Sequence, residues 1–383
     1  MRAALAIVMT TLALGGTSRL MLAQVPADAT TGFESIRMID ATTGWAVTDG
    51  RYVGVCGKEG CLLRTTDGGA NWRDATPLRS SGSKIRVWKF TVLSSLIAWV
   101  VPGDTQGTNA QIFRSVDGGR TWRSATIPAP SVTSISFINL REGWLIASIA
   151  AYSGHHEDEI YRSTNGGETW IKVAGATRDN NSSGLPDGAK TSVTFLTPTT
   201  GWITGIRGLP NVLYLYVTHD SGHTWRQQDV PLPRELTPHW EMTVPQPPPK
   251  FFTARDGILP AFYELLNDSG KPTGIVVVLY ATHDSGTTWT YTTPVSVAWE
   301  VVHHGVADMN HAWVLDGGVL RATSDGGRRW GTMPPNPFFA DVTQVDFISQ
   351  QVGWMTRRTF PFLLKTLDGG HTWTPVPYTI LRE

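Results

Sequence analysis

An eight-residue phrase returns seven times along this 383-residue chain. It reads Ser or Thr, any residue, Asp, two small residues, any residue, usually Thr, and then Trp. Its third position is held by Asp67, Asp117, Asn165, Asp220, Asp284, Asp325 and Asp368. Its last position is held by Trp72, Trp122, Trp170, Trp225, Trp289, Trp330 and Trp373, at intervals of 41 to 64 residues. A repeat of this period is typical of small supersecondary units that bury their apolar faces only against their neighbours.

Each phrase, which we call an acidic turn, predicts a tight turn between two strands. Small residues such as Gly68 and Gly69 supply the positive-φ positions that such turns need. The Asp carboxylate is expected to accept hydrogen bonds from backbone N–H groups of its own turn. The Trp is large enough to fill the wedge between neighbouring sheets. Because Asp recurs in six copies and Asn in the seventh, always in the same place, the pattern favours a structural role over catalysis.

A second element precedes each acidic turn, in which an apolar residue is followed seven positions later by Trp, as in Phe137 and Trp144. The fifth copy departs from this, since Phe251 leads to Ile258. With the alternating stretch that follows, the pattern predicts four strands per unit. Seven such units predict an all-β, seven-bladed β-propeller with four-stranded antiparallel blades, the acidic turns joining strands three and four. The blades are expected at about 33–78, 79–128, 129–177, 187–233, 249–294, 295–335 and 341–380. How the ring closes stays open, because the tail YTILRE could add an edge strand.

Loop lengths divide the predicted ring into two faces. The turns after the first and third strands are constant in length, whereas the second-to-third loops and the connections between blades vary. Function tends to lie on variable loops that a rigid scaffold holds. The candidate ligand residues on this loop-rich face are Asp104, His155, His156, Glu157, Asp158 and Trp240. The alternative is that these loops are plain spacers, and this applies equally to the Pro-rich stretch 231–250 around Trp240.

Composition and the N-terminus bound the class of protein. Lys plus Arg and Asp plus Glu balance at 32 each, which gives no support to nucleic-acid binding. Residues 1–23 have the charged start and apolar run of a secretory signal, with a retained membrane anchor as the alternative. We therefore expect a periplasmic or extracellular monomer, with residues 24–383 forming one domain and no membrane span after signal removal.

The two cysteines, Cys56 and Cys61, flank a predicted hairpin tip and are expected to form a disulfide, with two free thiols as the alternative. A metal needs three or four converging donors, whereas neighbours in the run His155–Glu159 point in alternate directions. We expect no metal site and no cofactor. No nucleophile elbow, phosphate loop or zinc-helix motif is present, so no catalytic residue is assigned.

The acidic turns resemble the Asp-box, or BNR, repeat. Together with the preceding Phe…Gly-Trp element, over about residues 33–378, the chain looks most like the photosystem II assembly/stability factor family of propellers. The resemblance implies an exported seven-bladed propeller that binds other proteins, in photosynthetic members as an assembly chaperone. Sialidases resemble the chain only in the boxes, because their Arg-Ile-Pro signature is absent. Xyloglucan-cleaving hydrolases use two propellers, and sortilin-type receptors have more blades and a Cys-rich module.

Two functional hypotheses follow. The first is a non-enzymatic scaffold that binds a protein or envelope ligand on its loop-rich face. The alternative is a glycan-active hydrolase, glycosidase or sialidase-like, which needs two carboxylates facing each other across a cleft. Its candidates are Asp104, Asp158, Asp187, Glu235, Glu264, Asp268 and Glu300.

Overall fold

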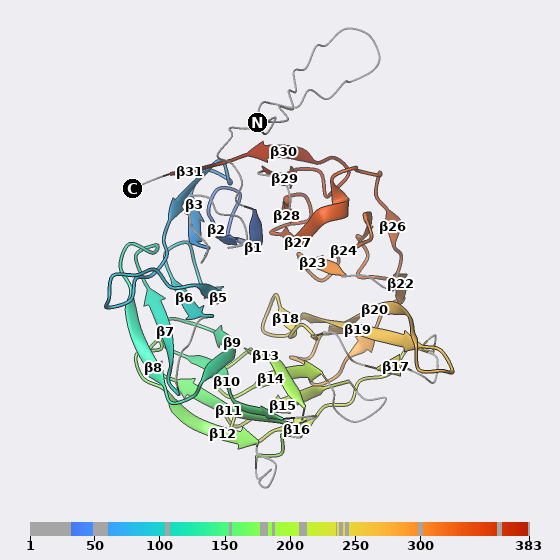
Figure 1. The fold of residues 1–383 in the computed structure, drawn as a ribbon. Coiled ribbons are helices and arrows are strands. Elements are labelled where there is room, and N and C mark those ends of the chain that lie inside the picture. The colour runs from blue at the N-terminus through green and yellow to red at the C-terminus, as the bar shows by residue number, and fades with distance from the viewer. Residues whose placement is uncertain are drawn as a thin grey trace.

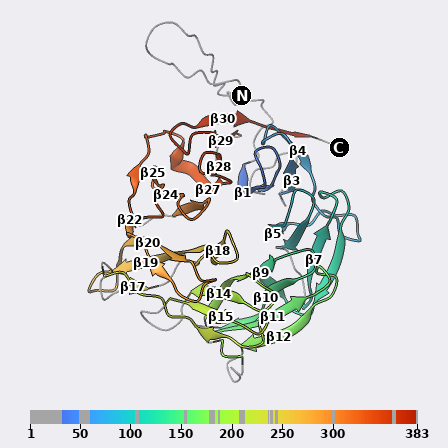
Figure 2. The ribbon, with the colours of Figure 1, turned by 180° about the vertical axis from the view of Figure 1, so that it is seen from behind.

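The computed structural model describes residues 32–48, 60–103, 108–152, 155–176, 183–185, 188–206, 213–234, 236, 240–241, 245–297, 302–357 and 362–381. Within these residues the chain forms seven sheets, or blades, around a central axis (Figure 1). The view from behind shows the same closed ring of blades (Figure 2). The predicted all-β, seven-bladed propeller with four-stranded antiparallel blades is therefore confirmed.

In most blades four strands pair in sequence order from the axis outwards. Blades one to three consist of β1 (Phe33–Met38), β2 (Gly44–Thr48), β3 (Leu62–Thr65) and β4 (Asn71–Asp74); β5 (Val87–Val92), β6 (Ala98–Pro102), β7 (Ala110–Ser115) and β8 (Arg123–Ile127); and β9 (Ser131–Phe137), β10 (Gly143–Tyr152), β11 (His155–Ser163) and β12 (Ile171–Ala176). Blades four, six and seven consist of β13 (Ala189–Phe195), β14 (Gly201–Ile206), β15 (Leu215–Thr218) and β16 (Arg226–Gln227); β23 (His303–Val306), β24 (Ala312–Asp316), β25 (Val319–Thr323) and β26 (Gly331–Thr332); and β27 (Val342–Phe347), β28 (Gly353–Arg357), β29 (Phe362–Thr366) and β30 (Thr374–Pro377). A 3-10 turn, η1 (Phe339–Asp341), precedes β27. Among the described residues, no helix is long and apolar enough to cross a membrane.

The acidic turn of every blade is hydrogen-bonded to the turn between the first and second strands of the same blade. In blade two the Gly118 N–H donates to the Leu96 carbonyl at 2.9 Å, and in blade four the Ser221 N–H donates to the Thr199 carbonyl at 3.0 Å. Both kinds of turn therefore lie on one face of the ring, which we call the turn face. The opposite face, which carries the second-to-third loops and the connections between blades, is the loop face.

Within each acidic turn the polar side chains bind the backbone of the turn itself. In blade two the Ser115 hydroxyl donates to Asp117 Oδ1 at 2.8 Å and accepts the Gly119 N–H at 2.8 Å. Asp117 Oδ1 also accepts the Arg120 and Thr121 N–H groups, both at 3.0 Å. The carboxylate thus satisfies backbone donors that would otherwise lack partners in so tight a turn.

The constant interval between the apolar residue and Trp has a packing cause. Phe137 lies opposite Gly143 on the neighbouring strand, and a Cβ on that glycine would lie 2.3 Å from the Phe137 ring. The ring stacks on Trp99 of the preceding blade, with centroids 3.7 Å apart and planes at 8°. The same stack joins Trp144 to Phe195 and Trp313 to Phe347. At these three junctions the motif therefore packs one blade against the next.

Blade five departs from the pattern in its first strand. It consists of β17 (Trp240–Glu241), β18 (Lys250–Phe251), β19 (Gly257–Leu266), β20 (Pro272–Thr282), β21 (Thr290–Tyr291) and β22 (Val295–Val297). Both β17 and β18 pair with β19, and each contributes only two residues. Between them the buried Gln246 side chain accepts the Phe262 N–H at 2.9 Å and donates to the Phe262 carbonyl at 3.1 Å. An amide side chain thus replaces the strand pairing that a Pro-rich segment cannot provide.

The C-terminal tail closes the ring. Strand β31 (Thr379–Leu381) runs parallel to β4 of blade one and forms its fifth, outermost strand. The two lie side by side next to the end of blade seven (Figure 1). The Thr379 N–H donates to the Ala70 carbonyl at 2.9 Å. The sequence alone did not decide how the ring closes. In the structure the C-terminal tail is added to blade one as an edge strand.

Candidate binding site at the loop face

A channel runs along the axis of the ring. It consists of two cavities of about 1210 and 1000 Å³, lined mainly by the innermost strands of the blades. Residues lining both cavities join them into one space; these are Arg37, Ser134, Ile135, Ser192, His303 and Gln344. A concave space of this size is within the range that ligand sites occupy.

The innermost strands share a β-bulge near the loop-face mouth of this channel. The strand register shifts by one residue at each bulge and leaves an unpaired residue, namely Glu34, Trp88, Thr133, Thr191 and Thr343. Each of them stands four positions before the apolar residue of the Phe…Gly-Trp element. Bulges re-aim side chains and are frequent beside functional sites. Glu34, Trp88 and Thr343 line the cavity of about 1210 Å³, which we call the mouth cavity. Thr133 and Thr191 line a smaller pocket beside it.

Trp88 is the large member of this set. It is 58% exposed, although it lies on a strand that borders the channel. It lines both the mouth cavity and a smaller pocket of about 400 Å³ between blades two, three and four. Exposed tryptophans beside a concave surface are typical of recognition sites.

The floor of the smaller pocket holds a buried ion pair. Lys190 Nζ lies 3.4 Å from Asp158 Oδ2, and the two side chains are 0% and 3% exposed. Burial raises the pKa of Asp158, and the positive charge of Lys190 opposes that rise. The pair therefore brings little net charge to the pocket.

Two cationic side chains, Lys250 and Arg37, line the turn-face end of the channel, and each is engaged within the protein. Lys250 Nζ donates to the Val306 carbonyl at 2.5 Å, and burial, together with the charge of Arg37, lowers the pKa of Lys250 to about 8. Arg37 pairs with Asp346 at 3.3 Å. Burial and the neighbouring charges of His303 and Lys250 lower the pKa of His304 to about 4, so this imidazole is neutral at pH 7.

The run His155–Glu159 does not form the loop that the sequence analysis expected. It is the start of β11, in which Tyr152 lies opposite His155 across a short hairpin from β10. His156 and Glu157 are partly buried and Asp158 is buried, so the run does not form a common ligand surface. The cause is strand length: β10 has 10 residues and β11 has 9, so the two strands extend blade three at its loop-face end. Asp104 lies outside the described residues.

Trp240 is a core residue in the structure. Its side chain is 5% exposed and contacts Tyr263 edge to face, with ring centroids 4.8 Å apart. It therefore does not present its ring on the loop face. The Pro-rich stretch that carries it serves as the inner edge of blade five.

The structure describes three of the seven carboxylates that the hydrolase hypothesis named. Asp158 and Glu264 are buried and Asp268 is exposed. Asp104, Asp187, Glu235 and Glu300 lie outside the described residues. Glu34 and Asp341, which the sequence analysis did not single out, both line the mouth cavity. The described part of the chain contains no group of three or more His, Cys, Asp or Glu side chains that could hold a metal.

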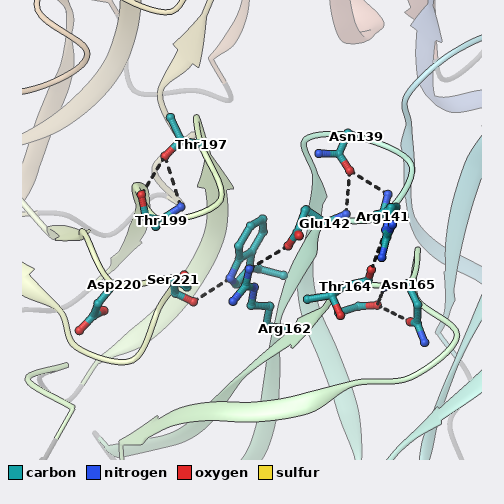
Figure 3. Close-up of polar contacts among 12 residues, drawn as sticks. Asn139, Arg141, Glu142, Arg162, Thr164, Asn165, Thr197, Thr199, Asp220 and Ser221 are labelled. Atoms are coloured by element: carbon teal, nitrogen blue, oxygen red, sulfur yellow. Dashed lines mark hydrogen bonds and ion pairs between the residues drawn. The ribbon is translucent and has the colours of Figure 1, made fainter.

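The acidic-turn residues bind their own turns and the neighbouring blades. The indole N–H donates to a carbonyl of the same turn in Trp72, Trp170, Trp225 and Trp373. Figure 3 shows the junction of blades three and four. There the Trp144 indole N–H donates to the Ser221 carbonyl, and the Arg162 guanidinium lies over the Trp144 ring, 5.5 Å from its centre. Arg162 is held there by Glu142, with Nη2 and Oε2 3.0 Å apart.

Cys61 is buried and disulfide-bonded. Its expected partner, Cys56, lies outside the described residues, so the pairing stays a prediction.

Comparisons with known proteins show the fold. No protein-family model matches the chain, and no curated protein sequence matches it. A xyloglucanase from Xanthomonas campestris, described as GH74, is similar in structure with a TM-score of 0.57 and 15% identity, over 92% of this chain and 54% of that one. The chain thus spans about half the length of that enzyme. YCF48 from Cyanidioschyzon merolae is 19% identical with a TM-score of 0.47, over 91% and 98% of the two chains. A YCF48 bound to D1 peptide is 18% identical with a TM-score of 0.35, over 73% and 93%.

Proposed function

We propose that this chain is an exported, non-enzymatic propeller scaffold that binds a protein or another envelope ligand at its loop face. In this proposal the acidic turns are Asp-boxes with a structural role, and the scaffold resembles the photosystem II assembly factors in kind. Export rests on the signal-like residues 1–23.

The observation that carries the proposal is the placement of Trp88. It is 58% exposed at the loop-face mouth of an axial channel, on a bulge that turns it out of the sheet. Tryptophan is among the residues that most often carry binding energy at interfaces. The acidic turns, in contrast, direct their polar groups to their own backbone.

The proposal is tested by capturing ligands from a native envelope extract on the immobilised full chain. Trp88→Ala should reduce capture of specific ligands without lowering the melting temperature. Leu367→Ala, which removes a 67% exposed side chain from an acidic turn on the opposite face, is the matched control. Equal capture by the wild type and Trp88→Ala would contradict a ligand site at this mouth.

A glycan-active hydrolase is the alternative. One observation favours it, since Glu34 and Asp341 line the same mouth cavity and retaining or inverting glycosidases use two carboxylates. However, Arg357 Nε donates to Asp341 Oδ1 at 2.6 Å, so this carboxylate already has a cationic partner within the protein. Release of reducing sugar from a glycan panel by the wild type, lost in Glu34→Gln, would establish the alternative.

A further inference from the structure

The pocket between blades two, three and four has one flat aromatic wall. Trp88 provides it, and the ring rests against Gly103 at the end of β6. A Cβ at position 103 would lie 3.1 Å from Trp88 Cβ and 3.6 Å from Cε3, so a larger residue there would push the indole away. The bulge and this glycine together fix the direction of the ring while one face stays exposed.

Hydroxyl side chains share the rest of the lining with apolar side chains such as Pro102, Val132 and Ala151. The hydroxyl groups belong to Ser131, Thr133, Ser148 and Thr191 and come from three different strands. A hydroxyl can both donate and accept a hydrogen bond. Such a lining matches a ligand that itself has many hydroxyl groups, each of which also donates and accepts.

The charges around the pocket cancel or are already engaged. Asp158 and Lys190 form the buried pair of its floor. Lys89 Nζ donates to the Thr133 carbonyl, so this ammonium is directed at the backbone. An ionised ligand would find no unopposed partner among these three side chains. The remaining ionisable residue of the lining, His156, interacts electrostatically with Asp158. The lining therefore favours a neutral ligand.

The strand edges beside the pocket do not suit an added peptide strand. A peptide that extends a sheet needs a regular row of backbone groups along the edge. The bulges at Trp88, Thr133 and Thr191 interrupt that row on each of the three innermost strands nearest the pocket. A compact ligand fits the pocket better than an extended chain.

We propose that this pocket binds one neutral pyranose unit of an envelope glycan, with the apolar face of the sugar ring stacked on Trp88. The proposal rests on the proposed function, because it names the chemical class of a ligand at the loop face. The hydroxyl groups of the sugar hydrogen-bond the Ser and Thr side chains of the opposite wall, and the volume of about 400 Å³ suits one or two sugar rings.

The test combines a printed array of neutral and acidic glycans with titration calorimetry on neutral hexasaccharides of glucose, mannose and N-acetylglucosamine. The full chain should bind at least one neutral glycan. Trp88→Ala should weaken that binding by about tenfold, as expected for the loss of one aromatic stacking partner. Gly103→Val should weaken it as well, because the added side chain displaces the indole. Trp88→Phe should retain part of the affinity, and Leu367→Ala should retain all of it. Circular dichroism and melting curves verify that each variant is folded.

Two results would overturn the proposal. The first is the absence of any neutral glycan from the bound set, whether nothing binds or only acidic glycans bind. The second is equal affinity in the wild type and Trp88→Ala. If envelope proteins are captured in a Trp88-dependent way while no glycan binds, the saccharide proposal fails and the scaffold function stands. If glycans bind and no protein is captured, the saccharide is itself the ligand.

Discussion

Trp144 in blade three donates its indole N–H to the carbonyl oxygen of Ser221 in the acidic turn of blade four, at 2.9 Å. The same bond joins Trp99 to Gly166, Trp313 to Gly369 and Trp354 to Gly68. The last of these connects blade seven to blade one and so closes the ring on the turn face. The two sequence motifs, the acidic turn and the Trp seven residues after an apolar residue, therefore form one clasp between neighbouring blades.

The clasp predicts different effects of one substitution at two sites. In blade one the Trp45 indole N–H is buried without a hydrogen-bond partner, because Arg73 Nη2 donates to the Gly118 carbonyl at 2.8 Å instead. Trp144→Phe should lower the free energy of unfolding by about 1–2 kcal/mol more than Trp45→Phe, since only the former breaks a buried hydrogen bond. Urea denaturation of both variants measures the difference, and equal losses would contradict the clasp.

The acidic turns predict a graded response at Asp117. Asp117→Ala should reduce the free energy of unfolding by about 1.5–3 kcal/mol, because it leaves the backbone donors of the turn without an acceptor. Asp117→Asn should cost less, since Asn165 already fills this place in blade three and accepts the Thr169 N–H at 3.0 Å. Chemical denaturation of both variants tests this order, and a larger loss for Asn than for Ala would refute it.

The same turns predict a dependence of stability on pH. Hydrogen bonds from the Thr288 hydroxyl and N–H lower the pKa of Asp284 to about 2, below the value of about 3.9 expected in the unfolded chain. The folded pKa is the lower one, so the contribution of this carboxylate is present above about pH 4 and is lost as the pH falls towards 2. Asp284→Asn should therefore flatten the decline of the unfolding free energy between pH 4 and 2. Parallel declines in the two proteins would argue against it.

Two turns contain a serine where the other copies have glycine. Ser221 and Ser285 have φ of 68° and 64°, in the left-handed region that costs a residue with a Cβ about 1–2 kcal/mol. Ser221→Gly should raise the melting temperature. Ser285→Gly should raise it less, because the Ser285 hydroxyl donates to the Ala254 carbonyl at 2.8 Å and this bond would be lost. Differential scanning calorimetry ranks the two, and the reverse order would show that strain is not the deciding term.

Closure by the tail predicts the effect of a truncation. Ending the chain after Tyr378 removes β31 and its parallel pairing with β4. The outer edge of blade one then loses backbone partners such as the Thr379 N–H bound to Ala70. We expect a lower melting temperature and faster hydrogen exchange at residues 70–73. Unchanged exchange there would mean that the tail does not help to close the ring.

Much of the fold could be predicted from the sequence, because its repeats are local. Each acidic turn and each Phe…Gly-Trp element is complete within about eight residues, so the number of blades and their turns follow from the spacing. The role of Trp240 could not be predicted in this way. Trp240 is buried through its contact with Tyr263, which is distant in the sequence. A Trp surrounded by prolines is equally compatible with a surface position.

The candidate site was missed for a related reason. Trp88 occupies the position that holds Thr133, Thr191 and Thr343 in other blades. The change from Thr to Trp at one position of the repeat can be seen in the sequence. Its exposure depends on a bulge, however, and a bulge shifts the alternation that would otherwise place this side chain against a neighbour. When the first strands of these five blades are aligned on their apolar ends, the position holds Glu34, Thr133, Thr191, Thr343 and Trp88, of which only Trp88 is aromatic.

The central claim is that stability and recognition are separated between the two faces of the ring. The most direct measurement compares Asp117→Ala and Trp88→Ala in two assays, the free energy of unfolding and the capture of envelope ligands per folded molecule. We predict that Asp117→Ala lowers stability and leaves capture unchanged, whereas Trp88→Ala reduces capture at unchanged stability. Loss of capture in Asp117→Ala at an unchanged melting temperature would contradict the claim.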